Sequence, residues 1–322
     1  MSDRLPPQRH EAIRKAIGRA HLHFSEPQEK PQAIIIAAQP GAGKTAFAKA
    51  AQAELAGNGG SVLIDPDRLR ERHPDYNRFL REDDKTAAER AHPDASQWAK
   101  ELRQDAIEGR RNIVIDATLN DKEKARELLG QLRSAGYQIE VRALAVHQRD
   151  SRQGIQARYE NARQKGEAAR RVPDAIHDEA YKGMPAALGH IEHHGLADRV
   201  TVMRRDGTAI YRNDRAASAT SGLSQIALLA ERGRDPTEEE KLRHARGWDK
   251  VHAQMKNRNA DSRDLAKVSD YRWEAHDRLG TRQAPEASGG RAEPVPKPGP
   301  DSVQALALAQ KARLADWSRR TR

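Results

Sequence analysis

The chain has 322 residues, 37% of them hydrophobic and 32% charged, and its 57 basic and 47 acidic side chains give a formal net charge of +10. This length suits one α/β domain with a smaller appendage, and the absence of cysteine excludes disulfides, thiolate metal sites and cysteine nucleophiles. No run approaches the roughly 18 apolar residues of a membrane helix, and the first residues lack the apolar core of a signal peptide, so we expect a cytoplasmic protein with no membrane partner.

Apolar runs and helical patterns alternate through the first two thirds of the chain. After an amphipathic helix over 8–24, strands are predicted at 33–38, 62–65, 112–117 and 139–146, with helices over 44–56, 94–109, 121–135, 150–166 and 173–195. Continuous apolar strands separated by helices indicate a parallel sheet with crossover helices. Asp206 and Gly207 stand between two further strand-like runs and predict a hairpin. We therefore predict an α/β fold with a central parallel sheet flanked by helices.

The character of the sequence changes after residue 213. Thr237 and Glu240 have the spacing of a capping box and predict the start of a helix. The segment 284–300 is rich in proline and glycine, as linkers are. The predicted organisation is an N-terminal helix and linker (1–32), the main α/β domain (33–213), a C-terminal helical extension (214–283), a Pro-rich linker (284–300) and a terminal helix (301–322, helical over 301–319).

A glycine-bearing loop follows the first predicted strand. Residues 38–45 read AQPGAGKT, which matches the P-loop pattern of Gly, four residues and Gly-Lys-Ser/Thr, except that Ala38 takes the place of the first glycine. Lys44 is expected to reach the β- and γ-phosphates of ATP, and the Thr45 hydroxyl to bind the Mg²⁺ that ATP carries. The helix after the loop directs its N-terminus at the anion. The predicted ATP-binding residues are Gln39, Pro40, Gly41, Ala42, Gly43, Lys44, Thr45 and Ala46.

Carboxylates follow the second and third predicted strands. Asp65 and Asp67 follow the second strand, and Asp116 and Thr118 follow the third. The carboxyl ends of parallel strands are where α/β sheets bind ligands, and a carboxylate there can accept the proton of a hydroxyl acceptor. The alternative is that Asp65 or Asp67 only caps the next helix. Asp116 is expected either to orient Mg²⁺ or to bind substrate hydroxyls.

Three arginines suit a lid over ATP. Arg158 lies in QARYE, and Arg170 and Arg171 lie in AARRVPD. Arginine stabilises the charge that spreads over a transferring phosphoryl group, although the spacing alone fits surface arginines equally well. The histidines, among them His73 and His177, are expected on solvated helix faces, because no metal-ligand spacing connects them.

These motifs together resemble the zeta-toxin family of bacterial toxin–antitoxin systems. The resemblance runs from about residue 30 to 212 and rests on AAQPGAGKT, VLIDPDRLRERHPDY, NIVIDATL, QARYENARQ, RRVPDAIHDEAYKGMP and DRVTVMRRDGTAIYRN, in this order and spacing. It implies a P-loop kinase that uses ATP and Mg²⁺ to phosphorylate the amino-sugar hydroxyl of UDP-N-acetylglucosamine, and so acts as a toxin against cell-wall synthesis. It also implies a restraining partner, which is either an antitoxin protein or an inhibitory tail within the same chain.

The resemblance assigns the catalytic roles residue by residue. The family's catalytic base corresponds to Asp67, and its P-loop lysine to Lys44. The two arginines that stabilise the transition state correspond to Arg158 and to Arg170, with Arg171 as the alternative if the register shifts by one.

The acceptor side departs from the family pattern. The acidic residue after the third strand is usually glutamate in the best-known members and is Asp116 here. A helical glutamate of the family falls on Lys100, with Glu101 next to it. Asp65, Asp67, Asp116, Thr118 and Glu101 are therefore the expected substrate-binding residues.

Other functions remain open at this point. One is a kinase for another nucleotide or nucleotide sugar, and a second is a P-loop ATPase that acts on nucleic acid, which the positive charge suggests. Aromatic residues make up only 4% of the chain, too few for a base-stacking platform, and a motor has no need of an acceptor base at Asp67. We therefore do not expect nucleic acid as a partner. A catalytically idle binding protein is the third alternative, and the intact Lys44, Thr45 and Asp67 argue against it.

Overall fold

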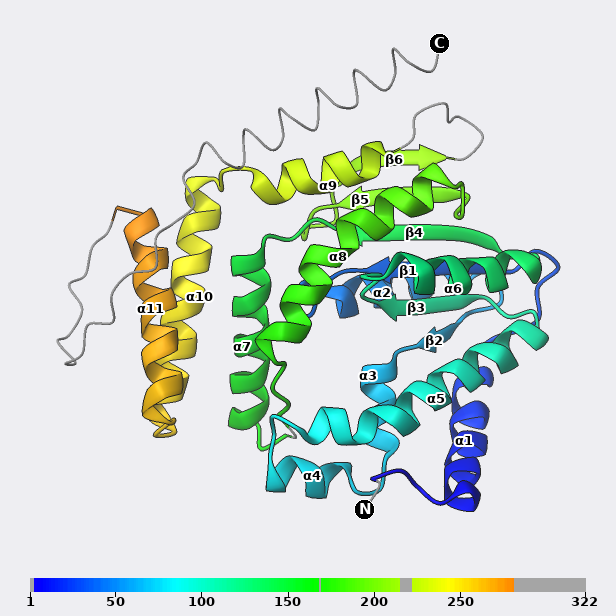
Figure 1. The fold of residues 1–322 in the computed structure, drawn as a ribbon, viewed down its shortest axis with the longest axis horizontal. Helices are drawn as coiled ribbons and strands as arrows, with labels where there is room; N and C mark the ends of the chain where they lie inside the picture. Colours follow the sequence, from blue (N-terminus) through cyan, green and yellow to red (C-terminus); the bar gives the residue numbers. More distant parts are fainter. Residues whose placement is uncertain (1–2, 168, 215–221, 281–322) are drawn as a thin grey trace, which may run out of the picture. The chain divides into compact units, whose positions relative to one another are not determined.

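A mixed sheet with strand order β2-β3-β1-β4-β5-β6 forms the centre of the computed structural model (Figure 1), which describes residues 3–167, 169–214 and 222–280. All neighbouring strands are parallel except the last pair, in which β6 runs antiparallel to β5. The turn between β5 and β6 contains Gly207 with φ +94°, as the predicted hairpin requires. The α/β class is confirmed. The strands are β1 (Gln32–Ala37), β2 (Val62–Ile64), β3 (Ile113–Ala117), β4 (Gln138–Leu144), β5 (Arg199–Met203) and β6 (Ala209–Asp214).

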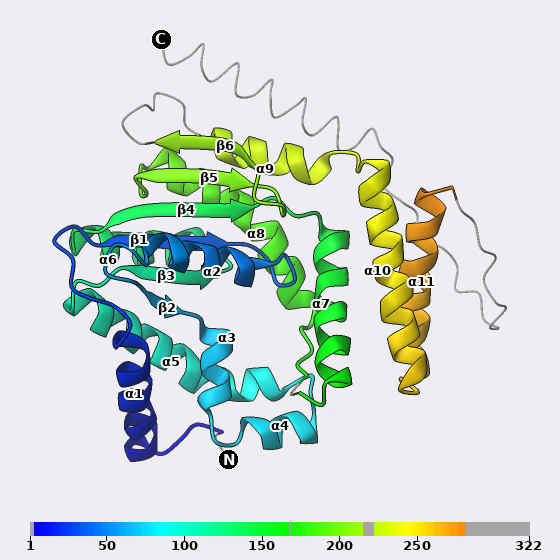
Figure 2. The same cartoon turned by 180° about the vertical axis from the view of Figure 1, so that it is seen from behind.

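Alternate residues of β1 face two helical layers. Ile35 belongs to the larger core, which includes buried residues of α5 (Ala87–Glu108), α6 (Lys122–Ser134) and α8 (Asp174–His193). Ile34 and Ile36 point the other way and pack against α2 (Lys44–Leu55). Figure 1 shows α5, α6 and α8 in front of the sheet, and Figure 2 shows α2 on the opposite face. Because side chains alternate between the two faces and both faces are buried, the strand sequence is a continuous apolar run.

Helix α5 begins earlier than predicted. The expected start at residue 94 follows Pro93, which has no N–H to donate to a helical hydrogen bond. The helix nevertheless runs from Ala87 through Pro93, because Ala87 and Ala91 are buried against Tyr76 and Phe79. Those aromatic side chains belong to α4 (Tyr76–Glu82), which the sequence pattern did not indicate. The helix that Asp65 or Asp67 was expected to cap is the short α3 (Pro66–Leu69), followed by the 3₁₀ turn Arg70–Arg72.

Helices continue beyond β6. They are α9 (Leu223–Gly233), α10 (Glu238–Asn257) and α11 (Ser262–Arg278), and the capping box of Thr237 and Glu240 at the start of α10 is formed as predicted. Leu228 of α9 is buried in the larger core, and the described residues up to Gly280 belong to one compact unit. The domain boundary expected at residue 213 stays a prediction, and the expected linker and terminal helix lie outside the described residues.

Two more helices complete the arrangement. The N-terminal helix α1 (Pro7–Leu22) packs against α5, and α7 (Gln148–Gln164) lies beside α10 (Figure 1). None of the helices in the described part of the chain is long and apolar enough to span a membrane.

Candidate nucleotide-binding and catalytic site

The loop between β1 and α2 has the backbone of a phosphate-binding loop. Gly41 and Gly43 adopt positive φ values of +79° and +101°, which side chains disfavour. Helix α2 begins after Gly43 without a side-chain cap, so its first N–H groups suit an anion. Lys44 Nζ donates to the carbonyl of Ala38 at 2.8 Å and lies 3.4 Å from Asp116 Oδ1. The loop, the helix end and the lysine together fit a polyphosphate.

The same loop touches α7 backbone to backbone. A Cβ on Gly41 would stand 2.0 Å from the carbonyl oxygen of Ser151, and one on Gly154 would stand 2.3 Å from the carbonyl oxygen of Gly41. Both glycines are therefore required for this contact. Gly154 was not among the predicted residues, although a glycine inside a helix costs roughly 1 kcal/mol relative to alanine, a signal that could have identified it.

Asp67 lies in the first turn of α3 and faces two arginines. Arg170 donates to both of its carboxylate oxygens, at 3.2 and 2.5 Å, and Arg70 Nη1 lies 2.6 Å from Oδ1. Burial alone would raise the pKa of Asp67, but the charges of Arg170, Arg70 and Lys44 outweigh it and hold that pKa well below its usual range. The structure thus brings the expected base and one expected arginine together. It adds Arg70, which the spacing of three residues within DPDRLR could have indicated.

The other strand-end residues have different partners. Asp65 caps α3, since its Oδ1 accepts from the N–H groups of Asp67 and Arg68 at 3.0 and 3.3 Å. Burial raises the pKa of Asp116 to about 6 despite the nearby Lys44. Thr118 donates its hydroxyl to Asn120 Oδ1 at 2.8 Å. The helix-capping alternative for Asp65 is therefore what the geometry shows, and Asp116 is the carboxylate beside the lysine.

The other two expected arginines, Arg158 and Arg171, have different surroundings. Arg158 of α7 is exposed and makes no hydrogen bond or ion pair within the described ranges, and the charges that act on it include those of Arg170, Asp67 and Asp116. Arg171 turns elsewhere, because its Nη2 binds Asp264 of α11 at 2.5 Å. Arg170, rather than its neighbour, therefore belongs to the site.

Glu101 lies away from these residues. Its carboxylate accepts from Gln97 at 2.8 Å and lies 3.8 Å from the guanidinium of Arg14 on α1. Among the described residues, Glu101 contacts neither Lys44 nor Asp67. Its expected part in substrate binding stays a prediction without geometric support.

Two histidines expected on solvated surfaces are buried. His73 and His177 are 2% and 1% exposed. His73 lies 3.6 Å from Asp94, and His177 contacts Asp178 at 2.8 Å. His177 is satisfied by the carboxylate of Asp178 and the hydroxyl of Ser151, whereas the Nδ1 atom of His73 accepts from the N–H of Asp75 at 3.2 Å. No group of three or more His, Cys, Asp or Glu side chains in the described part of the chain could hold a metal ion.

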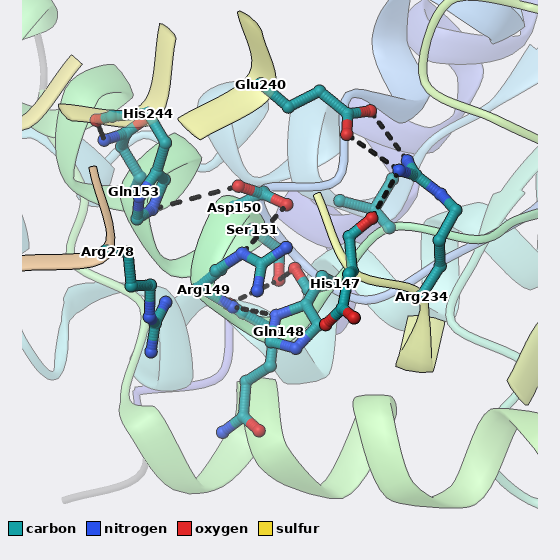
Figure 3. Close-up of polar contacts among 12 residues, drawn as sticks. His147, Gln148, Arg149, Asp150, Ser151, Gln153, Arg234, Glu240, His244 and Arg278 are labelled. Carbon is teal, nitrogen blue, oxygen red and sulfur yellow. Dashed lines mark hydrogen bonds and ion pairs between the residues drawn. The ribbon is translucent and has the colours of Figure 1, made fainter. Parts of the chain in front are cut away.

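Polar contacts fix the N-terminal end of α7 (Figure 3). His147 caps the helix by accepting from the N–H of Arg149 at 3.0 Å. Gln153 donates to the carbonyl of His244 on α10 at 2.6 Å. These contacts join α7, the helix that carries Arg158, to the helices beyond β6.

A parallel sheet whose first strand leads through such a loop into a helix, with a lysine at the helix start, defines a P-loop protein of the α/β class. A family model described as Zeta toxin matches residues 17–216. The chain belongs to this family.

Individual toxins of this family are similar to the chain. Toxin zeta of Enterococcus hirae is 26% identical over 184 residues, which cover 57% of this chain and 64% of that protein, less than two thirds of its length. Toxin PezT of Streptococcus pneumoniae serotype 4 is 26% identical over 208 residues, 63% of this chain and 80% of that protein.

Solved structures share the fold. A chain of the PezAT chromosomal toxin–antitoxin system of Streptococcus pneumoniae has a TM-score of 0.67 and 20% identity, over 80% of this chain and 99% of that one. AvrRxo1-ORF1:-ORF2 with ATP gives a TM-score of 0.52 and 14% identity, over 84% and 86% of the two chains.

Proposed function

We propose that the protein is an ATP-dependent kinase that transfers the γ-phosphoryl group to a hydroxyl of a nucleotide sugar, with UDP-N-acetylglucosamine as the first candidate. The observation that supports this most is the pairing of Asp67 with Arg170 beside Lys44. A base, a cation for the phosphates and a movable arginine are the parts that phosphoryl transfer to a hydroxyl needs.

Each side chain then has a task. The loop backbone and Lys44 would hold the β- and γ-phosphates, and the Thr45 hydroxyl together with Asp116 would hold the Mg²⁺ that ATP carries, whose charge would offset that of the phosphates. Asp67 accepts the proton of the acceptor hydroxyl, whose oxygen forms the new bond to the γ-phosphorus while the bond to the bridging oxygen breaks and ADP leaves. Arg158 and Arg170 stabilise the charge on the transferring group.

The pairing of Asp67 with Arg170 describes a resting state. A carboxylate bound to a guanidinium through both oxygens is a poor proton acceptor, because the cation lowers its pKa. When the γ-phosphate arrives, Arg170 exchanges Asp67 for phosphate oxygens and frees the base. Binding of ATP thus prepares the site for the acceptor.

The residues expected on the acceptor side support a second candidate substrate. Asp116 is one methylene shorter than glutamate, and Glu101 faces Arg14 instead of the loop. These two differences support testing other nucleotide sugars and nucleotides beside UDP-N-acetylglucosamine. The resemblance to toxins also supports a restraining antitoxin, since Streptococcus pneumoniae PezAT is described as a toxin–antitoxin system.

The test is incubation of the full chain with γ-labelled ATP, Mg²⁺ and a panel of nucleotide sugars and nucleotides, followed by separation of labelled products. We expect label in UDP-N-acetylglucosamine with the wild type and at least a hundredfold less label with Asp67→Asn. Label in a different acceptor would correct the substrate. Release of inorganic phosphate alone, stimulated by nucleic acid, would replace the kinase with an ATPase.

A further inference from the structure

A buried arginine stands behind the phosphate-binding loop. Arg232, in the last turn of α9, is 4% exposed. Its Nη2 donates to Gln39 Oε1 and its Nη1 to the carbonyl of Tyr181, both at 2.8 Å. The guanidinium carbon also lies 4.1 Å from the centre of the Tyr181 ring. Through Gln39, a helix beyond the family match reaches the loop itself.

The charge of Arg232 is not balanced by a carboxylate. Neither its hydrogen bonds nor its ion pairs in the described part of the chain include an aspartate or glutamate. Burial lowers the pKa of Arg232 to about 10, so the side chain is still charged at neutral pH. The C-terminal carbonyl groups of α9 and the Tyr181 ring compensate only part of a full charge. A buried cation without a partner is strongly unfavourable.

A second set of hydrogen bonds holds Gln39 from the other side. Its Nε2 donates to the carbonyl of Val146 at 2.8 Å and to Ser151 Oγ at 3.2 Å. Ser151 Oγ lies 2.8 Å from His177 Nε2, and His177 Nδ1 lies 2.8 Å from Asp178. Ser151 is completely buried, so this serine, histidine and aspartate are not a nucleophilic triad. They fix the loop from α7 and α8 as Arg232 fixes it from α9.

We propose that Arg232 is a positioning residue for the nucleotide. It orients Gln39, which sets the loop, and it supplies a buried positive charge that the polyphosphate balances on binding. The inference rests on the proposed function, since it requires a polyphosphate at the loop. It adds a residue outside 17–216 to the nucleotide site, so the site is incomplete without α9.

The experiment compares Arg232→Met, which removes the charge at similar volume, with Arg232→Lys, which keeps it. Arg234→Gln is the matched control, because Arg234 lies two residues away and pairs with Glu240 at 2.7 and 2.8 Å (Figure 3). Affinity for ATP–Mg²⁺ is measured by calorimetry and turnover by product formation. We expect Arg232→Met to weaken ATP binding roughly tenfold, Arg232→Lys to recover most of the loss, and Arg234→Gln to bind like the wild type. At saturating ATP, kcat should change less than twofold.

Unchanged ATP affinity in a folded Arg232→Met protein would overturn the inference, and so would an Arg232→Lys protein that binds as weakly as Arg232→Met. If Arg232→Met does not fold, Arg232→Gln gives the same test, because it removes the charge but keeps an N–H donor for Gln39, and it should also weaken ATP binding. Lys44→Ala separates the two proposals. Loss of affinity in Lys44→Ala but not in Arg232→Met removes only this inference, whereas unchanged affinity in Lys44→Ala removes the nucleotide site itself.

Discussion

Two arginines beside Asp67 keep its carboxylate ionised and also occupy its oxygens. Arg170 and Arg70 hold its carboxylate ionised, and its side chain is still 52% exposed, so an acceptor can approach it. In the proposed reaction, Arg170 is also the arginine that stabilises the transferring phosphoryl group. The same ion pair therefore couples the readiness of the base to the presence of phosphate.

Replacement of this carboxylate tests that coupling. We expect Asp67→Asn to keep ATP binding but to lower turnover by about two to four orders of magnitude, the usual contribution of a positioned base. Calorimetry and single-turnover measurements with the preferred acceptor check the two parts. A collapse of nucleotide affinity with normal turnover of bound substrate would make Asp67 a metal or structural residue instead.

Asp116 gives a pH-dependent prediction. Burial raises its pKa from 3.8 to about 6, so the folded state binds a proton more tightly than the unfolded state does. Stability contributed in this way is present at low pH and is lost as pH rises towards and through 6. Asp116→Asn should therefore be more stable than the wild type at pH 8, by up to about 3 kcal/mol, and equal to it near pH 3–4. Urea unfolding without nucleotide at both values measures this, and a pH-independent difference would contradict it.

At the scale of elements, α11 braces the segment that carries Arg170. Arg171 binds Asp264 at 2.5 Å, and Lys267 of α11 binds Asp174 at 2.6 Å. A pocket of about 260 Å³ is lined by this segment, α7, α10 and α11. The two ion pairs from α11 thus fix Arg171 and Asp174, while the pocket next to them stays open.

Loosening the brace should change catalysis more than stability. Asp264→Asn removes a partly exposed ion pair, so we expect a loss of about 1 kcal/mol or less in the free energy of unfolding. We expect kcat to fall roughly two- to tenfold, because Arg170 is held less firmly, with little change in KM for ATP. Asp270→Asn, on an exposed position of the same helix, is the control. Equal kcat in the two variants would show that α11 does not position Arg170.

For the whole molecule, the helices beyond β6 are part of the fold. A chain that ends at Asn213 loses Leu228 from the larger core, the buried Arg232, and Ser224, which donates to Glu192 at 2.8 and 2.9 Å. We expect this truncation to expose apolar surface of α8 and β5 and to fold poorly. A chain that ends at Gly280 should unfold cooperatively like the full chain. Circular dichroism melting compares them, and a stable protein ending at Asn213 would contradict the prediction.

The shorter stable chain also tests restraint in cis. If residues 281–322 inhibit the proposed kinase, their removal should raise activity or toxicity. A tail tethered to the same chain acts at an effective concentration that its linker sets.

In growing bacteria we expect the wild type to slow growth or cause lysis and Asp67→Asn to be harmless. If both proteins were equally toxic, the toxicity would come from the net positive charge of the chain and not from phosphoryl transfer. An unchanged rate after removal of 281–322 would leave restraint to a separate antitoxin.

Much of this protein could be predicted from local sequence. The strands, the loop over 38–45, the hairpin at Gly207 and the capping box of α10 agree with the pattern. Apolar periodicity and the backbone preferences of glycine and capping residues act over a few neighbouring positions, so they can be read without tertiary contacts.

The choice between neighbouring charged residues depended on tertiary structure. Arg170 and Arg171 are adjacent and equivalent by pattern, yet one binds Asp67 and the other Asp264 of α11. Arg232 and Gln39 meet across 193 positions of sequence. A charged side chain takes its partner from whichever elements pack against it, and that packing is decided by the burial of apolar faces far apart in the chain. The sequence alone therefore determined the phosphate-binding loop, and only the packed structure decided which arginine lies beside Asp67.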